Sequence, residues 1–150
     1  MKFTKGLFFI TIIAVAFALC PAFAADSPVG MWKTIDDKTG EAKSFLQVWE
    51  KDGVYFGKVA KLIQKPGEDP NPKCTKCKGK LKDQPILGMT IMWGLKQNGD
   101  EYSGGNIMDP DNGQTYKCKI KVLNGGKKLE VRGFIGFSVI GRSQYWLKAD

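Results

Sequence analysis

Two cysteines, Cys74 and Cys77, stand in the run NPKCTKCKGK at a spacing that suits four kinds of chemistry. A Cys-x-x-Cys pair can be a thiol redox site, part of a zinc site, a haem attachment point or a structural disulfide. Haem attachment requires a histidine directly after the second cysteine, and Lys78 stands there instead. A thioredoxin-type redox pair follows a strand and opens a helix. A structural disulfide, a metal site and a redox site remain possible interpretations, and the proline-rich surroundings favour the structural disulfide.

The pairing of the cysteines stays open at this stage. Cys118 lies in the alternating run TYKCKIKV, in which the apolar residues fall on one face of a strand, so we expect it to point inward. A bond between Cys74 and Cys77 would leave Cys118 free. Either other pairing would tie the Cys-x-x-Cys segment to a core strand and would close a larger loop, which constrains the unfolded chain more. A zinc site would need a carboxylate as its fourth ligand.

The sequence contains no histidine. This excludes serine–histidine and cysteine–histidine nucleophiles, as well as histidine metal sites. The acidic run DPDNG at Asp109 to Gly113 is typical of a turn, because proline presets one torsion and Asn-Gly accepts positive φ. We therefore expect a protein that is not an enzyme and that uses no cofactor and no metal.

The first 24 residues have the pattern of a secretory signal peptide. Lys2 and Lys5 precede the uncharged run from Leu7 to Leu19, which is too short to span a bilayer. Ala22-Phe23-Ala24 provides the small residues that precede a cleavage site, so we expect cleavage after Ala24 and one domain over residues 25–150. Lipidation of Cys20 is disfavoured by the large residue before it. The expected location is periplasmic or secreted, where thiols tend to be oxidised.

The chain is basic, with a formal net charge of +8, which becomes +6 once Lys2 and Lys5 are removed. The lysines are spread along the chain rather than gathered in blocks, which is typical of a solvated surface. We expect no nucleic-acid partner. A peripheral contact with the cell envelope stays open, as does the oligomeric state.

The remaining sequence reads as strands joined by tight turns. Asp52-Gly53 is the strongest hairpin signal among these turns. The pattern predicts an all-β fold, an eight-stranded antiparallel up-and-down barrel, with a long Cys-bearing insertion at Gln64 to Asp83 between strands 3 and 4. The predicted strands are Gly30–Asp37, Ala42–Glu50, Val54–Ile63, Met89–Lys96, Glu101–Met108, Thr115–Val122, Lys128–Gly136 and Ser143–Ala149.

Three residues near the chain ends bear on closure of the barrel. Gly30 and Trp32 form a Gly-x-Trp on the first strand, and Arg142 precedes the last strand. This resembles the lipocalin, or calycin, pattern. The resemblance implies that the tryptophan plugs one end of the barrel and that the arginine guanidinium lies on its ring.

A closer resemblance covers most of the chain. The motifs are GMWKTIDDKTGEAKS, DGVYFGKV, CTKC with KGKLKDQPILGM, GGNIMDPDNGQTYKCKI and VRGFIGFSVIGRSQYW. Together they resemble an uncharacterised family of secreted bacterial proteins with a lipocalin-like barrel. The resemblance implies a fold and a compartment, and no established activity.

The expected function is the binding of a small apolar or amphipathic molecule inside the barrel. Strand aromatics and one interior glycine are the candidate lining: Phe45, Trp49, Tyr55, Trp93, Tyr102, Tyr116 and Gly133. Two alternatives remain. The protein could be an envelope interaction module that acts through its basic Cys-containing insertion, or a thiol redox protein that uses Cys74 and Cys77.

Overall fold

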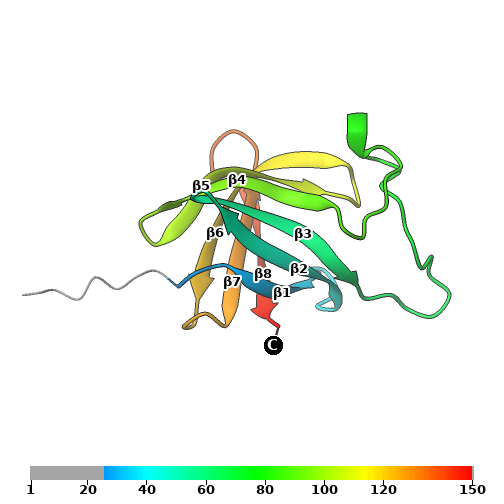
Figure 1. The fold of residues 1–150 in the computed structure, drawn as a ribbon, viewed down its shortest axis with the longest axis horizontal. Helices are drawn as coiled ribbons and strands as arrows, with labels where there is room; N and C mark the ends of the chain where they lie inside the picture. Colours follow the sequence, from blue (N-terminus) through cyan, green and yellow to red (C-terminus); the bar gives the residue numbers. More distant parts are fainter. Residues whose placement is uncertain (1–25, 150) are drawn as a thin grey trace, which may run out of the picture.

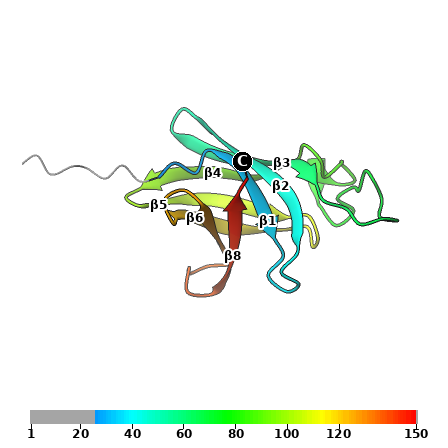
Figure 2. The same cartoon turned by 90° about the horizontal axis from the view of Figure 1, so that it is seen from below.

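A computed structural model describes residues 26–149, so the predicted signal peptide and its cleavage site lie outside the described residues. Residues 26–149 form eight antiparallel strands that close into a barrel in chain order, with β1 beside β8 (Figures 1 and 2). The predicted fold class is confirmed. The strands are β1 (Gly30–Ile35), β2 (Ala42–Lys51), β3 (Val54–Leu62), β4 (Thr90–Asn98), β5 (Glu101–Asp109), β6 (Gln114–Leu123), β7 (Lys128–Phe134) and β8 (Gly141–Lys148).

Every predicted strand is present, and its ends differ from the prediction by at most two residues. Asp52 and Gly53 both have positive φ, at 53° and 75°, as the tight turn between β2 and β3 requires. Gly104 and Gly105 accompany a register shift between β5 and β6, which is the bulge that an interior glycine pair indicates. The predicted seventh strand extends too far, because the chain leaves the sheet after Phe134.

Side chains alternate between the two faces of the barrel wall, and the inward ones form the core. On β6, Cys118 and Ile120 are buried, whereas the lysines between and beside them are half-buried or exposed. The inward core residues are Trp32, Leu46, Val48, Val59, Met92, Leu95, Tyr102, Cys118, Ile120, Leu129, Val131 and Trp146. This core runs from Trp32 at one end of the barrel to Met92 and Cys118, which pair with Ile107 and Gly133.

Trp32 seals that end. Its side chain is fully buried, and its indole N–H donates to the carbonyl of Pro28 at 2.7 Å. Residues 26–29 therefore lie across the end of the barrel, and the Tyr102 hydroxyl donates to the Asp26 carbonyl at 3.4 Å. The expected plug is in place.

The cation that lies over the Trp32 ring is Lys148. The prediction that Arg142 contacts Trp32 is wrong. Lys148 Nζ lies 4.6 Å from the centroid of the Trp32 ring, and it also donates to the Val29 carbonyl at 2.9 Å. The register explains this, because antiparallel pairing sets Trp32 opposite Lys148, near the end of β8. Arg142, near the start of β8, pairs instead with Asp37, beyond the other end of β1.

The insertion between β3 and β4 extends sideways from the barrel (Figures 1 and 2). It folds back on itself through a bridge between Lys73 and Pro85, and it carries the short 3-10 helix η1 (Gly79–Leu81). Among residues 26–149, no helix is long and apolar enough to span a membrane.

The contacts that close the barrel around Trp32 predict the order in which three substitutions lower the free energy of unfolding. Trp32→Ala should destabilise the protein by about 3–5 kcal/mol, as removal of a buried aromatic side chain does. Lys148→Ala should cost about 0.5–2 kcal/mol through the lost cation–π contact, and Arg142→Ala about 0–1 kcal/mol, because its ion pair is exposed. Urea denaturation of the three variants measures this order. A larger loss for Arg142→Ala than for Lys148→Ala would contradict this account of closure.

Candidate functional site

The two ends of the barrel differ in how they are covered. One end carries residues 26–29 and the short turns after β2, β4 and β6. The opposite end carries the connections at residues 36–41, 63–89, 110–113 and 135–140. We call the second one the open end.

Inward side chains are sealed at the first end and reached by water at the open end. In the sealed half, most inward residues are buried. Toward the open end the burial is mixed. Met92 and Cys118 are buried beside their register partners Ile107 and Gly133. The half-buried or exposed inward positions there are Thr34, Ser44, Leu62, Ile107, Tyr116, Gly133, Arg142 and Gln144. The Arg142 side chain is 52% exposed although its strand position faces inward. The barrel interior is therefore buried around Trp32, and at the open end some of its inward side chains are reached by water.

A chain of hydrogen bonds runs along one side of the open end. The Asp37 carboxylate accepts from the Arg142 guanidinium through Nε and Nη2, and it also accepts from the Gln144 amide at 3.2 Å. Gln144 Oε1 in turn accepts from the indole N–H of Trp146 at 3.2 Å. Asp37 thus neutralises Arg142 and holds the side chains of Arg142 and Gln144 in place.

A second polar pair lies on the neighbouring strands. The hydroxyl groups of Thr34 and Ser44 are 2.8 Å apart, and the Ser44 backbone N–H donates to the Thr34 hydroxyl at 3.1 Å. The two residues are register partners on β1 and β2. They extend the polar side of the open end onto both strands.

The opposite side of the open end is apolar. Gly133 pairs with Cys118 and faces inward, as its alternation with Leu129 and Val131 predicts. A Cβ at this position would lie 3.5 Å from Tyr116 Cβ and 3.7 Å from Ile107 Cγ2, which is ordinary contact. Asn112 donates to the Tyr116 hydroxyl at 3.0 Å, so the phenol ring is held from the β5–β6 turn. Gly133 leaves space in front of Tyr116 and Ile107.

Two of the predicted lining residues, Tyr116 and Gly133, lie at the open end. Tyr55 and Tyr102 also face inward, but they pack edge to face at 4.7 Å in the sealed half. Trp93 follows the fully buried Met92 and is half-buried at the margin of the core.

Phe45 and Trp49 point outward, so their assignment to a pocket is wrong. Lys33 and Lys61 lie 5.8 Å and 5.7 Å from the Phe45 ring, and Trp49 stacks on Phe56 at 5.4 Å. The alternation explains both, because Leu46 and Val48 occupy the inward positions of β2. Aromatic character indicated strands correctly but did not indicate which face each ring takes.

The sequence interpretation missed the polar residues of the site: Thr34, Asp37, Ser44 and Gln144. Counting back from Trp146 in steps of two would have placed Gln144 and Arg142 on the inner face of β8. Thr34 follows from Trp32 in the same way. Asp37 carried no such signal, since it lies in a connection beyond the end of β1.

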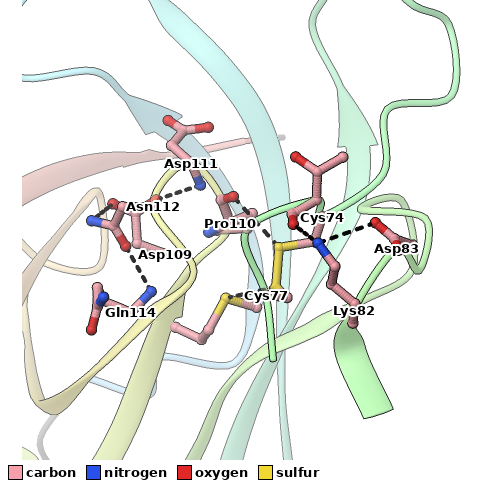
Figure 3. The surroundings of a disulfide bond; sticks show 11 residues. Cys74, Cys77, Lys82, Asp83, Asp109, Pro110, Asp111, Asn112 and Gln114 are labelled. Carbon is pink, nitrogen blue, oxygen red and sulfur yellow. Dashed lines mark hydrogen bonds and ion pairs between the residues drawn. A yellow bond between two sulfur atoms is a disulfide. The ribbon is translucent and has the colours of Figure 1, made fainter. Parts of the chain in front are cut away.

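The cysteine pairing is settled by the structure. Cys74 and Cys77 form a disulfide (Figure 3), and among residues 26–149 Cys118 is left as a free, buried thiol. The pairings that would tie the insertion to β6 are therefore wrong. Cys74 Sγ lies 3.5 Å from the Pro110 carbonyl oxygen, and Cys77 Sγ lies 3.6 Å from Met108 Sδ.

The disulfide packs against the outside of the barrel wall. Met108 alternates with the inward Ile107, so it points outward, yet it is buried in the same cluster as both cysteines. Gly113 permits this approach, because a Cβ there would collide with the Lys76 carbonyl. The packing of the disulfide therefore holds the insertion beside the open end, and the insertion does not cover that end.

Two hollows lie on the outer surface of the barrel. One is lined mainly by charged side chains of β5, β6 and β7, and the other lies between the insertion and the start of β4. Both are open to solvent, and neither encloses the apolar surface that small-molecule sites usually provide. Within residues 26–149, no group of three potential metal ligands comes together.

Comparison with known proteins agrees with this architecture. Residues 30–148 match a family described as "Uncharacterized protein conserved in bacteria (DUF2147)". The chain belongs to this family. The expected membership in an uncharacterised bacterial family is thereby confirmed, and the family description assigns no activity.

A solved structure shares the fold. It is described as "Protein HP1028 from the human pathogen Helicobacter pylori belongs to the lipocalin family", and it matches with a TM-score of 0.69 and 18% identity over 81% of this chain and 82% of that one. At this identity the likeness establishes the lipocalin-like fold alone. No curated protein matches the chain significantly.

Burial lowers the chemical reactivity of all three cysteines. Cys74 is 0% and Cys77 4% exposed, so the disulfide is shielded from an attacking thiolate. Burial also raises the pKa of the Cys118 thiol to about 12, which keeps it protonated and unreactive. Neither environment resembles the exposed, electropositive setting of a redox-active cysteine.

The Cys118 pKa predicts a pH dependence of stability. The unfolded thiol loses its proton near pH 9.0, whereas the folded thiol holds it to about pH 12. Its contribution is fully present below pH 9.0 and falls by up to about 1.4 kcal/mol per pH unit above that value. Cys118→Ala removes this term, so denaturation at pH 8 and pH 10.5 should show a steeper loss for the wild type. Equal losses in the two proteins would contradict the buried thiol.

The shielded disulfide predicts slow reduction. Folded protein treated with a dithiol should keep the Cys74–Cys77 bond, whereas protein in denaturant should lose it rapidly. Alkylation followed by mass spectrometry measures both states, with Cys118 labelling as the internal marker of unfolding. Rapid reduction at native stability, without Cys118 labelling, would instead support the thiol redox alternative.

Proposed function

We propose that this protein binds a small amphipathic molecule in the open end of its barrel. The observation that supports the proposal is the change along the interior, from inward side chains sealed by packing to inward side chains reached by water. A closed eight-stranded barrel has room inside for side chains or for one small ligand. In this chain the side chains take one half, and the ligand takes the other.

The two sides of the open end suit the two parts of an amphipathic molecule. Leu62, Ile107 and Tyr116 offer an apolar surface, and Gly133 leaves space in front of two of them. Gln144 and Arg142 lie on the polar side. Asp37 holds the arginine through Nε and Nη2, which leaves Nη1 to donate to a polar group of the ligand.

The site supports a binding role more than a catalytic one. Its titratable pair, Asp37 and Arg142, is neutralised internally, and its remaining groups are hydroxyls, an amide and apolar side chains. We propose the periplasm or the exterior as its location. The disulfide favours an oxidising compartment, and the signal pattern of residues 1–24 points the same way.

The expected affinity is modest. A ligand of about ten to twenty heavy atoms that gains about 0.3 kcal/mol per atom would bind in the millimolar to micromolar range. An exposed polar side and a small apolar wall do not support much more.

Substitutions of Gly133 test whether a ligand binds at the open end. Gly133→Leu should fill the space before Tyr116 and Ile107 and lower the binding of a fluorescent fatty-acid probe at least tenfold, with the melting temperature nearly unchanged. Gly133→Ala is the matched control, because its methyl group would make only ordinary contacts. Probe titration and melting curves should be measured for all three proteins.

Two outcomes would count against the proposal. They are a wild type that binds no such probe, and a Gly133→Leu variant that binds it as well as Gly133→Ala does. The basic insertion would then be the next candidate, with loss of partner capture on deletion of residues 64–83 as its test.

A further inference from the structure

The connection between β7 and β8 displays apolar side chains with little beside them. Ile135, Phe137, Val139 and Ile140 are 69%, 79%, 82% and 68% exposed. Figure 2 shows this connection, residues 135–140, extending beyond the two strands that it joins. We call it the apolar loop. Large apolar side chains gathered at such exposure mark a surface that meets another apolar phase.

The loop has a defined conformation. Arg132 on β7 donates from Nε to the Ser138 carbonyl at 2.7 Å and from Nη2 to the Val139 carbonyl at 3.3 Å. The Ile140 N–H donates to the Phe137 carbonyl at 3.0 Å and closes a turn. The apolar side chains are therefore presented by an ordered backbone, and little further ordering is needed when they are buried.

Two basic side chains stand at the root of the loop. No acidic residue occurs between Glu130 and the end of β8. Lys117 pairs in register with Phe134 at the root of the loop, and among residues 26–149 neither Lys117 nor Arg132 has a carboxylate within ion-pair distance. We call Lys117 and Arg132 the root cations. The Arg132 guanidinium also donates from Nη1 to Ser143 Oγ, which lies 3.1 Å from a Glu130 carboxylate oxygen, and the nearby Arg142 is paired with Asp37. A partner would therefore meet apolar side chains at the tip and, behind them, two cations that form no direct ion pair within residues 26–149.

This combination points to one occupant. A stable protein interface buries about 800 Å² on each partner, more than four loop side chains can supply by themselves. Side chains that project singly also need a partner that deforms around them. A bilayer does so, and anionic headgroups lie just outside its hydrocarbon.

We propose that the apolar loop inserts into the interface of an anionic phospholipid bilayer, with Phe137 and Val139 in the acyl region and the root cations among the phosphates. The attachment is peripheral and reversible. It rests on the loop alone and is independent of ligand binding at the open end.

Vesicle flotation tests the proposal with a chain of residues 25–150, since the barrel is complete within residues 26–149. Phosphatidylglycerol vesicles should carry the protein, and phosphatidylcholine vesicles should carry roughly tenfold less, because each basic residue near an anionic surface strengthens attachment. The double variant Phe137→Ser/Val139→Ser should bind phosphatidylglycerol vesicles on the order of tenfold or more weakly. Leu147→Ser, which alters an exposed apolar residue of β8, is the matched control and should bind like the wild type.

Three further variants test separately the charge at the root of the loop, the fixed conformation of the loop and the depth to which residue 137 enters the bilayer. Lys117→Gln should reduce attachment and its sensitivity to salt. Arg132→Lys keeps the charge but lacks the planar group that holds two carbonyls, so it should weaken attachment while leaving the salt dependence in place. In Phe137→Trp, the added tryptophan should shift its fluorescence to the blue on mixing with vesicles.

Three results would overturn the proposal. The first is no attachment of the wild type to phosphatidylglycerol vesicles. The second is equal attachment of the wild type and the double serine variant. The third is a dimer, seen by ultracentrifugation, that the double serine variant abolishes while vesicle attachment is absent, which would assign the loop to contact between two copies of this chain.

Discussion

The pairing of β1 with β8 is the constraint on which the rest of the structure depends. Seven of the contacts between neighbouring strands follow from hairpins or from the connection between β3 and β4, and closure is the step that links the two ends of the sheet. The short register that joins Trp32 to Lys148 removes both sheet edges. It also sets the indole across one end of the barrel. With that end sealed, the exposed inward side chain of Arg142 lies at the other.

Closure also determines where Arg142 acts. Because β8 runs antiparallel to β1, the residue opposite Trp32 is near the C-terminal end of β8, and Arg142 is carried to the opposite end of the barrel. The arginine that a lipocalin pattern would place on the plug instead meets Asp37 and lines the open end. The register of β8 therefore places a residue expected to stabilise the fold in the candidate site.

Much of the fold could be predicted because its signals are local. Turn residues such as Asp52 and Gly53 mark where strands stop, and alternation in TYKCKIKV marks which side is buried. The candidate site could be predicted only in part, because it depends on register between distant strands. Tyr116 and Gly133 were found since each lies on a strand with clear alternation. Phe45 and Trp49 were misplaced because lysine stems and a neighbouring ring half-bury them on the outer wall, which sequence composition does not distinguish from the core.

The separation of the disulfide from Cys118 affects how the cross-link within residues 26–149 is kept in its native pairing. Cys74 and Cys77 are three residues apart, so their thiols meet by the shortest loop available, while Cys118 comes later in the chain and is buried once β5, β6 and β7 pair. Of the three pairings open to these cysteines, the native one closes the shortest loop. In the folded barrel the Cys118 thiol is buried in the wall, so it is kept from attacking the disulfide and exchanging with it.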